Sequence, residues 1–376
     1  MSNTNNVVRQ INDLRQNLGE QAFRFSTFDT NVCKGMAILF MILHHAVGKY
    51  YNDVDLSWYS ANANSTDLTS LLFLFLSTAG KVCVPLFTVL SGFGIAKSYS
   101  AFLGGRRHAG LWEDVGFVAG RYLKLYSIYL PIALLVSLKL LCGAMARGDV
   151  SHALWLLRHA LFDLNMLHRT LLDGFTWYLD AMLVLLLLFP ILRRCIARCP
   201  AVVLILTAIP WLDRLAIHSL HLNFDSVWSC LFPFSIGVCF QRKEILDRFK
   251  IDKMGTNNAM VPVAGLCASF ALRLVFALPM DILFALSIIF FEVNVVASFE
   301  YLAKTLSFLG RHSANMWLLH VTVLGSLSGS MTYRFAMATL VTLVVSCLLE
   351  KAKIATGYNR LFMWARGRMS CLRAVA

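Results

Sequence analysis

Ten long apolar runs alternate with shorter polar segments along this chain of 376 residues. A helix needs about 20 mostly apolar residues to cross the hydrocarbon core of a bilayer, and most of the runs come close to that length. The runs fall near residues 31–48, 71–98, 120–145, 174–193, 201–217, 225–242, 258–277, 279–298, 305–327 and 331–351. The pattern therefore predicts an all-α, polytopic membrane helix bundle with about ten transmembrane helices.

Three segments do not fit a simple crossing. Residues 1–27 are polar but carry apolar residues at helical spacing, which predicts an amphipathic helix on the cytoplasmic membrane surface. The second run is too long for one span, so we expect "STAGK" at 77–81 to separate a re-entrant or interfacial piece at 68–76 from the true helix. Residues 151–168 mix apolar residues with His and Arg, which predicts an amphipathic helix in an external loop.

Positive charge is distributed unevenly between the apolar runs. Cytoplasmic loops of membrane proteins are enriched in Lys and Arg. Only Lys49, Arg147, Arg158 and Arg169 fall in alternate segments that would face outward, whereas every segment that would face inward carries several basic residues. The bias places the N- and C-termini in the cytoplasm. The predicted layout is a cytoplasmic N-terminal segment at 1–27, a transmembrane domain at 28–352 and a basic cytoplasmic tail at 353–376.

The amino-acid composition supports the membrane assignment and argues against nucleic acid and metal ions as binding partners. Hydrophobic residues make up 58% of the chain and charged residues 15%, against about 25% charged in soluble domains. The net charge of +13 fits basic loops facing anionic lipid, and no basic stripe interleaved with aromatics points to nucleic acid. The ten cysteines are scattered without zinc-type spacing, so we expect neither a structural disulfide nor a metal site.

The first apolar run carries three ionisable residues, Lys34, His44 and His45. Such groups are costly inside a bilayer and usually functional. Eleven helical steps separate Lys34 from His45, so the two share one face about 16 Å apart, whereas His44 is turned away by about 100°. The spacing fits a path from a cytoplasmic cation to a base. It fits equally a snorkelling lysine and a histidine bonded to a neighbouring carbonyl.

Five segments occur in the order typical of one family. "NVCKGMAILFMILHH" (31–45) resembles the first helix of the membrane acyltransferase-3 family, which has Arg or Lys, ten residues and then His. The later segments that resemble family motifs are "PLFTVLSGFGIAKSY" (85–99), "RYLKLYSIYLP" (121–131), "WYLDAMLVLLLLFPIL" (177–192) and "LGRHSANMWLLH" (309–320). Lys34, Lys124 and Trp317 depart from the more common Arg, Arg and Tyr at their positions.

The resemblance implies an enzyme that moves an acyl group, usually acetyl, from cytoplasmic acyl-CoA to a hydroxyl of an extracytoplasmic saccharide. It implies that Lys34, Arg121 and Lys124 hold the phosphates of the donor. His45 would act as general base, or would accept the acyl group itself. His320 matches the late family histidine and lies at a similar predicted depth, so it is either a site residue or a core histidine.

The sequence gives weaker evidence that the other polar residues inside the runs are functional. Glu292 is a functional candidate because it is a carboxylate in mid-membrane, but it could instead pair with a cation. Arg273 and Asp281 lie near one helix end and are expected to pair. Asp180 could orient an imidazole or be solvated at the interface, and Ser91 is expected to be a packing residue.

The function predicted from these observations is an integral membrane O-acyltransferase of the plasma or inner membrane. A transporter or exporter of a glycan or small solute is the alternative, because it could use the same polar path without chemistry. A third possibility is a receptor-like membrane protein. Broken helices in paired positions, which are typical of transporters, are not seen.

Overall fold

A computed structural model describes residues 24–48, 79–104, 106, 109–162, 177–216, 225–242, 244–251, 259–276 and 280–370. These residues form helices and connecting turns, and none of them is in a strand, which agrees with the predicted all-α class. The surface helix predicted before residue 24 and the short piece at 68–76 lie outside the described residues.

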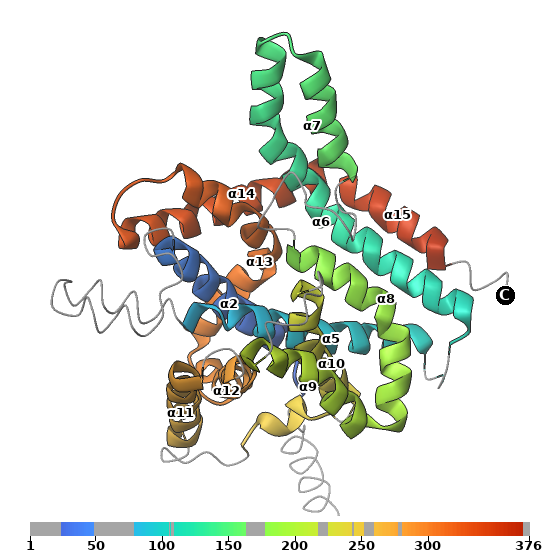
Figure 1. Cartoon of the computed structure of the whole chain (residues 1–376), viewed down its shortest axis with the longest axis vertical. Helices are drawn as coiled ribbons and strands as arrows, with labels where there is room; N and C mark the ends of the chain where they lie inside the picture. The colour runs from blue at the N-terminus through green and yellow to red at the C-terminus, as the bar shows by residue number, and fades with distance from the viewer. Residues whose placement is uncertain are drawn as a thin grey trace, which may run out of the picture.

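Each of the ten apolar runs contains one α-helix of the bundle in Figure 1. These helices are α2 (Thr27–Gly48), α5 (Cys83–Leu103), α6 (Leu111–Ala146), α8 (Trp177–Arg198), α9 (Pro200–Ala216), α10 (Asp225–Arg242), α11 (Met260–Phe276), α12 (Asp281–Asn294), α13 (Glu300–Ser326) and α14 (Met331–Ala355). The remaining elements are α7 (Val150–Phe162), α15 (Tyr358–Ser370) and the short 3-10 helices η1 (Leu246–Phe249) and η4 (Val296–Ser298).

Five of the described helices are long and apolar enough to cross a membrane: α2, α5, α6, α12 continued through η4, and α14. The apolar helices α9 and α11 are shorter. These helices indicate a multi-pass membrane protein. The count of about ten spans and the cytoplasmic position of both termini stay predictions.

Helices α2 and α13 form the closest pair, and two glycines allow their backbones to touch. A Cβ on Gly35 would lie 2.0 Å from the carbonyl oxygen of Leu306, and one on Gly310 would lie 1.8 Å from that of Asn31. Close backbone approach at small residues is the usual way in which helices associate in lipid. The pair shares the apolar core of the bundle with α5 and α12.

Helices α5 and α10 repeat this arrangement. A Cβ on Gly92 would lie 2.3 Å from the carbonyl oxygen of Phe234, and one on Gly237 would lie 2.1 Å from that of Val89. The end of α5 lies near the beginning of α2, because Lys97 Nζ donates to the Phe25 carbonyl at 3.0 Å. Helices α2 and α5 therefore run in opposite directions, as consecutive spans must.

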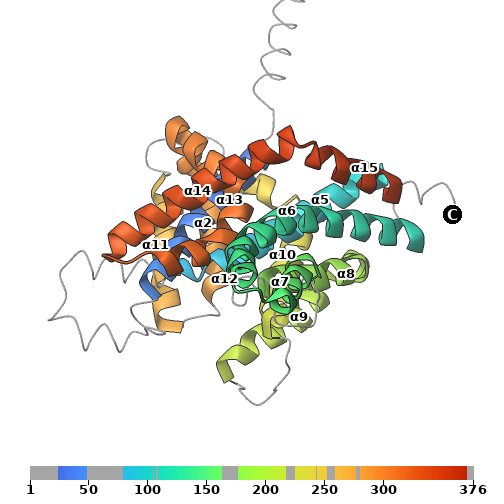
Figure 2. The ribbon, with the colours of Figure 1, turned by 90° about the horizontal axis from the view of Figure 1, so that it is seen from above.

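The remaining helices pack around these two pairs. Helix α7 folds back along the end of α6 (Figure 1), and its residues Val150–Phe162 overlap most of the amphipathic segment predicted at 151–168. Helix α15 lies beside α6 in both views (Figures 1 and 2). The predicted pairing of Arg273 with Asp281 is confirmed, with 2.6 Å between Arg273 Nε and Asp281 Oδ1 in a buried setting.

Two glycines on α5 provide a matched test of the glycine contacts. A methyl group on Gly92 would clash with backbone, whereas one on Gly94 would meet nothing within 4 Å. We expect Gly92→Ala to lower the free energy of unfolding by about 1–3 kcal/mol, as overpacking does. Gly94→Ala should be neutral or stabilising by up to about 1 kcal/mol, because alanine favours the helix. Thermal melting of both purified variants measures the difference, and equal melting temperatures would contradict the close helix contact.

Candidate functional site

The Lys34–His45 face of α2 is continuous and largely covered by neighbouring helices. Helix α2 runs unbroken from Thr27 to Gly48. Ile38 and Met41, which lie on the same stripe between the two ionisable residues, are buried. Lys34 is half-buried, and the His45 side chain is exposed in the structure. The continuous helix required by the spacing argument is present, and each end of the stripe meets a different set of polar groups.

At the end of the stripe marked by His45, two imidazoles from different helices meet. The ring centroids of His45 on α2 and His320 on α13 lie 4.9 Å apart. His320 Nδ1 lies against the carbonyl of Trp317, one turn earlier in its helix. A carbonyl can only accept a hydrogen bond, so Nδ1 carries the proton and Nε2 of the neutral ring is an acceptor. That Nε2 is buried and has no hydrogen-bond partner among the described residues.

His44 turns to a different neighbour, as the helical spacing predicts. A Cβ on Gly80 would lie 2.5 Å from His44 Cβ, so the backbone at residues 79–80 packs directly on this histidine. The His44 side chain is half-buried there, and its ring is 5.2 Å from that of His45. The two adjacent histidines therefore have different packing neighbours: His44 lies on the backbone at residues 79–80, and the His45 ring lies against His320 on α13.

Two cations that sequence reasoning did not single out surround the same end of α2. Arg334 on α14 is 1% exposed and donates from Nη1 to the carbonyl of Ala46 at 2.8 Å. The charge of Lys81 is close enough to act on His45 and on Asp281. Arg334 could have been identified from the sequence, because a cation inside an apolar run is a functional candidate by default. Its contact with the residue after His45 depends on the packing of α14 against α2.

At the Lys34 end, cations from α2 and α6 come together. Lys34 and Arg121 are close enough for their charges to interact, and both side chains are half-buried. Lys124 follows Arg121 by three residues and is exposed. Two of the three predicted donor-binding cations thus lie within electrostatic range of one another, and the third lies one turn further along α6. Like charges brought together are a suitable receptor for a polyanion.

Helix α15 borders this basic part of α6. The Tyr358 hydroxyl donates to the Ser127 carbonyl at 3.2 Å, and the Phe362 ring lies 6.5 Å from that of Tyr126. Burial, with a smaller effect of Tyr126, raises the pKa of Tyr358 to about 12, so the phenol keeps its proton at neutral pH. The helix is therefore fixed beside Arg121 and Lys124 by a hydrogen bond and an aromatic contact.

Between the two ends lies a hydroxyl cluster. Tyr178 on α8 and Ser91 on α5 are hydrogen-bonded, with 3.3 Å between their oxygens, and Thr88 contributes a further hydrogen bond to Tyr178. The Tyr178 ring packs edge-on against Trp317, at 5.1 Å between centroids. Trp317 is the residue whose carbonyl holds His320. Ser91, expected to be a packing residue, thus also takes part in a hydrogen bond.

The two candidate carboxylates, Glu292 and Asp180, have different neighbours. Glu292 is fully buried, and its Oε2 lies 3.7 Å from Cys33 Sγ. The Asp29 carboxylate is close enough to repel the charge of Glu292. Cys33 precedes His45 by twelve residues, which is about 18 Å along α2. Asp180 on α8 lies near Tyr122 of α6. The structure therefore brings His45 together with His320 and Lys34 within range of Arg121, and it places Glu292 at Cys33, well below His45 along α2.

Comparison with known proteins agrees with this arrangement. The family model described as an acyltransferase domain matches residues 29–351, which is most of the chain. The chain belongs to the membrane acyltransferase-3 family. It is therefore a membrane acyltransferase, and of the functions that the sequence left open, group transfer is favoured over transport. No curated protein and no solved structure matches the chain.

The family match covers every residue of the two clusters, from Lys34 on α2 to Arg334 on α14. No group of three or more His, Cys, Asp or Glu side chains within the described part of the chain is arranged to hold a metal ion. The candidate site of this acyltransferase consists of the Lys34–Arg121 pair, the His45–His320 pair and the hydroxyl cluster between them.

Arg334 provides a test of how the His45 end is held. We expect Arg334→Met to lower the free energy of unfolding by about 1–3 kcal/mol, because the Ala46 carbonyl loses a charged hydrogen-bond donor. Acyl transfer should fall as well, since Ala46 follows His45 directly, and Arg334→Lys should restore part of both. Arg311→Met, on the exposed face of α13, is the control. Melting and activity of Arg334→Met that match those of the wild type would contradict this role.

Proposed function

We propose that the protein transfers an acyl group, acetyl in the simplest case, from cytoplasmic acyl-CoA to a hydroxyl of an extracytoplasmic saccharide. The observation that carries the proposal is the pairing of functional groups at two levels of one helix. Cations meet at Lys34, and imidazoles meet at His45, about 16 Å further along α2. The family assignment supplies the class of reaction, and this separation suggests how donor and acceptor approach from opposite sides.

In this proposal the donor is held by charge. The phosphates of acyl-CoA bind Lys34 and Arg121, with Lys124 at the entrance, because guanidinium and ammonium groups make strong charge-assisted hydrogen bonds to phosphate. The pantetheine arm then follows the stripe past Ile38 and Met41 toward His45. These apolar side chains suit an uncharged arm, and they are supplied by the helix that carries both functional ends.

The chemical step uses the imidazole pair. His45 removes the proton from the attacking hydroxyl as its oxygen adds to the thioester carbonyl, and the tetrahedral intermediate then expels the CoA thiolate, which takes up a proton. In the substrate complex, a small turn of the His45 ring would let His320 Nε2, which has no hydrogen-bond partner among the described residues, accept from His45 and fix which nitrogen of His45 is basic. His320 is thus a positioning residue, consistent with its buried ring and its Nδ1–H on the Trp317 carbonyl.

The function is tested with the purified protein in liposomes, supplied with acetyl-CoA on one side and a saccharide acceptor on the other. Mass spectrometry of the saccharide detects the mass added by acetylation. Acetylation that requires both the protein and acetyl-CoA supports the proposal. Saccharide movement across the membrane without any change in mass would favour the transporter instead.

The two adjacent histidines should not be interchangeable. We expect His45→Ala to lower the rate of acyl transfer by about 10²–10⁴-fold, the usual contribution of a general base, without loss of folding. His44→Ala should lose little rate, because its side chain packs on the backbone at Gly80. Initial rates, measured beside thermal melting, separate the two effects. If His44→Ala were folded but inactive while His45→Ala stayed active, the general base would be His44 and not His45.

The cation pair should act on donor binding. Phosphate contacts hold substrate and transition state alike, so their loss raises KM more than it lowers kcat. We expect Arg121→Gln and Lys34→Gln each to raise the KM for acyl-CoA about tenfold, the effect of one lost charge-assisted hydrogen bond. Lys304→Gln, on an exposed Lys–Glu pair, is the control. A collapse of kcat with unchanged KM would contradict the donor role.

A further inference from the structure

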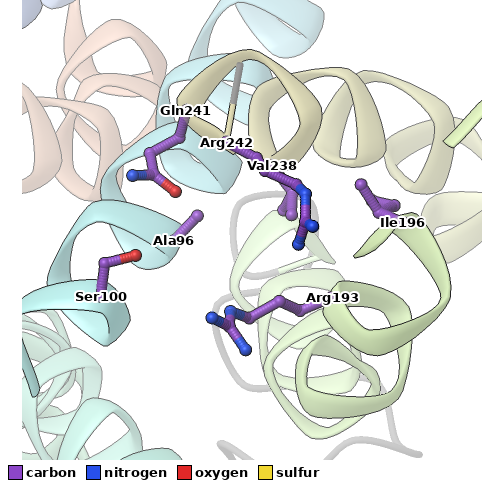
Figure 3. A pocket seen from close by; sticks show the side chains of 7 residues that line it. All are labelled: Ala96, Ser100, Arg193, Ile196, Val238, Gln241 and Arg242. Carbon is purple, nitrogen blue, oxygen red and sulfur yellow. The ribbon is translucent and has the colours of Figure 1, made fainter. Parts of the chain in front are cut away.

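A second basic site lies apart from the candidate active site, in a pocket of ≈ 150 Å³ between α5, α8 and α10 (Figure 3). Its lining residues are Ala96 and Ser100 from α5, Arg193 and Ile196 from α8, and Val238, Gln241 and Arg242 from α10. Figure 3 shows Arg193, Gln241 and Arg242 extending into the space between the three helices. None of these residues belongs to either cluster on α2.

The two arginines leave this pocket strongly positive. Arg242 and Arg194 lie close enough to repel the positive charge of Arg193. The carboxylate that attracts Arg193 is that of Asp114. Asp114 is buried, pairs with Arg194 and accepts a hydrogen bond from the Tyr99 hydroxyl. The Arg193 guanidinium rests on the Tyr99 ring at 4.7 Å and donates no hydrogen bond to any other described residue. Arg242 Nη2 donates to the Ala197 carbonyl at 3.3 Å, so two guanidinium groups border the pocket and neither is paired with a carboxylate among the described residues.

The rest of the pocket fits the level of lipid headgroups. Its apolar wall consists of Ala96, Ile196 and Val238, all nearly fully buried, while Ser100 and Gln241 add neutral hydrogen-bonding groups. The neighbouring helix α9 exposes apolar side chains at Val202, Ile205, Leu206 and Ile209. A basic pocket with an apolar wall beside a lipid-facing helix suits a phosphate attached to an apolar body.

We infer that this pocket binds a phosphate group, with Arg193 and Arg242 as its principal ligands. Arginine matches phosphate oxygens with two parallel N–H donors, and two arginines facing one small volume make a specific oxyanion site. The phosphate comes either from the headgroup of an anionic lipid or from a soluble phosphate. The site is additional to the proposed donor site, because its residues come from three helices that do not contribute the Lys34–Arg121 pair.

The lipid source is tested with the full-length protein in nanodiscs of phosphatidylcholine, with and without phosphatidylglycerol. Native mass spectrometry after extraction counts the lipids that remain bound. We expect the wild type to retain phosphatidylglycerol, and Arg193→Gln and Arg242→Gln each to reduce its retention about tenfold. Arg198→Gln, an exposed arginine on α8 outside the pocket, should retain it fully. If Arg198→Gln lost as much phosphatidylglycerol as the pocket variants, retention would depend on general surface charge and the proposed site would be wrong.

The soluble source is tested in phosphatidylcholine nanodiscs alone, by thermal melting with inorganic phosphate against chloride at equal ionic strength. A phosphate-dependent rise in the wild-type melting temperature that both arginine variants lack identifies a soluble ligand. If neither phosphatidylglycerol retention nor the phosphate response depends on Arg193 and Arg242, the inference is wrong. Arg193→Lys keeps the charge beside Tyr99 but loses the paired donors, so it replaces Arg193→Gln if that variant does not fold.

Discussion

The backbone contact between α2 and α13 is the constraint on which the candidate site depends. Gly35 lies on the Leu306 carbonyl and Gly310 on the Asn31 carbonyl, so neither helix can slide or rotate without a clash. His45 follows Gly35 by ten residues, and His320 follows Gly310 by ten residues. Because both helices rise by the same amount per residue, the two imidazoles reach the same level about 15 Å from the glycines. Their 4.9 Å separation follows from this register.

Several buried polar groups of the bundle bond to partners close by, as a bilayer requires. Arg273 is paired with Asp281, and Arg334 is bonded to the Ala46 carbonyl. Glu292 lies on Cys33, and Asn294, two residues later, bonds the backbone of the segment that carries η1. These residues stabilise helix contacts. The proposal assigns donor binding to the cations near Lys34 and chemistry to the exposed imidazole of His45.

Short-range regularity explains which features the sequence predicts well. The helical period places Lys34 and His45 on one face and turns His44 away, and the structure shows His45 toward α13 and His44 against Gly80. Apolar runs locate the ten helices. The pairing of Arg273 with Asp281 could be predicted because the two residues are close in sequence. The depth of His320 follows from counting along its helix, so its level beside His45 could also be predicted.

Contacts between helices distant in sequence were beyond such reasoning. Arg334 meets Ala46, Tyr178 meets Ser91, and Glu292 meets Cys33 only because of how the bundle packs. A carboxylate in an apolar run shows that it needs a partner, but the period of its own helix does not identify that partner. The sequence makes Glu292 a functional candidate because it is a carboxylate in mid-membrane, and the structure places it against Cys33 near the beginning of α2.

The arrangement of helix ends gives the site its direction. Lys97 on the Phe25 carbonyl joins the end of α5 to the start of α2, and Arg334 on the Ala46 carbonyl joins the start of α14 to the end of α2. The pocket with Arg193 and Arg242 lies at the same end of α5 as Lys97. Arginines and lysines thus collect where α2 starts, which is the side that the charge bias of the loops assigns to the cytoplasm. On that assignment, the proposed anionic donor would meet cations on the cytoplasmic side, and His45 lies toward the opposite surface, where the proposed saccharide acceptor would arrive.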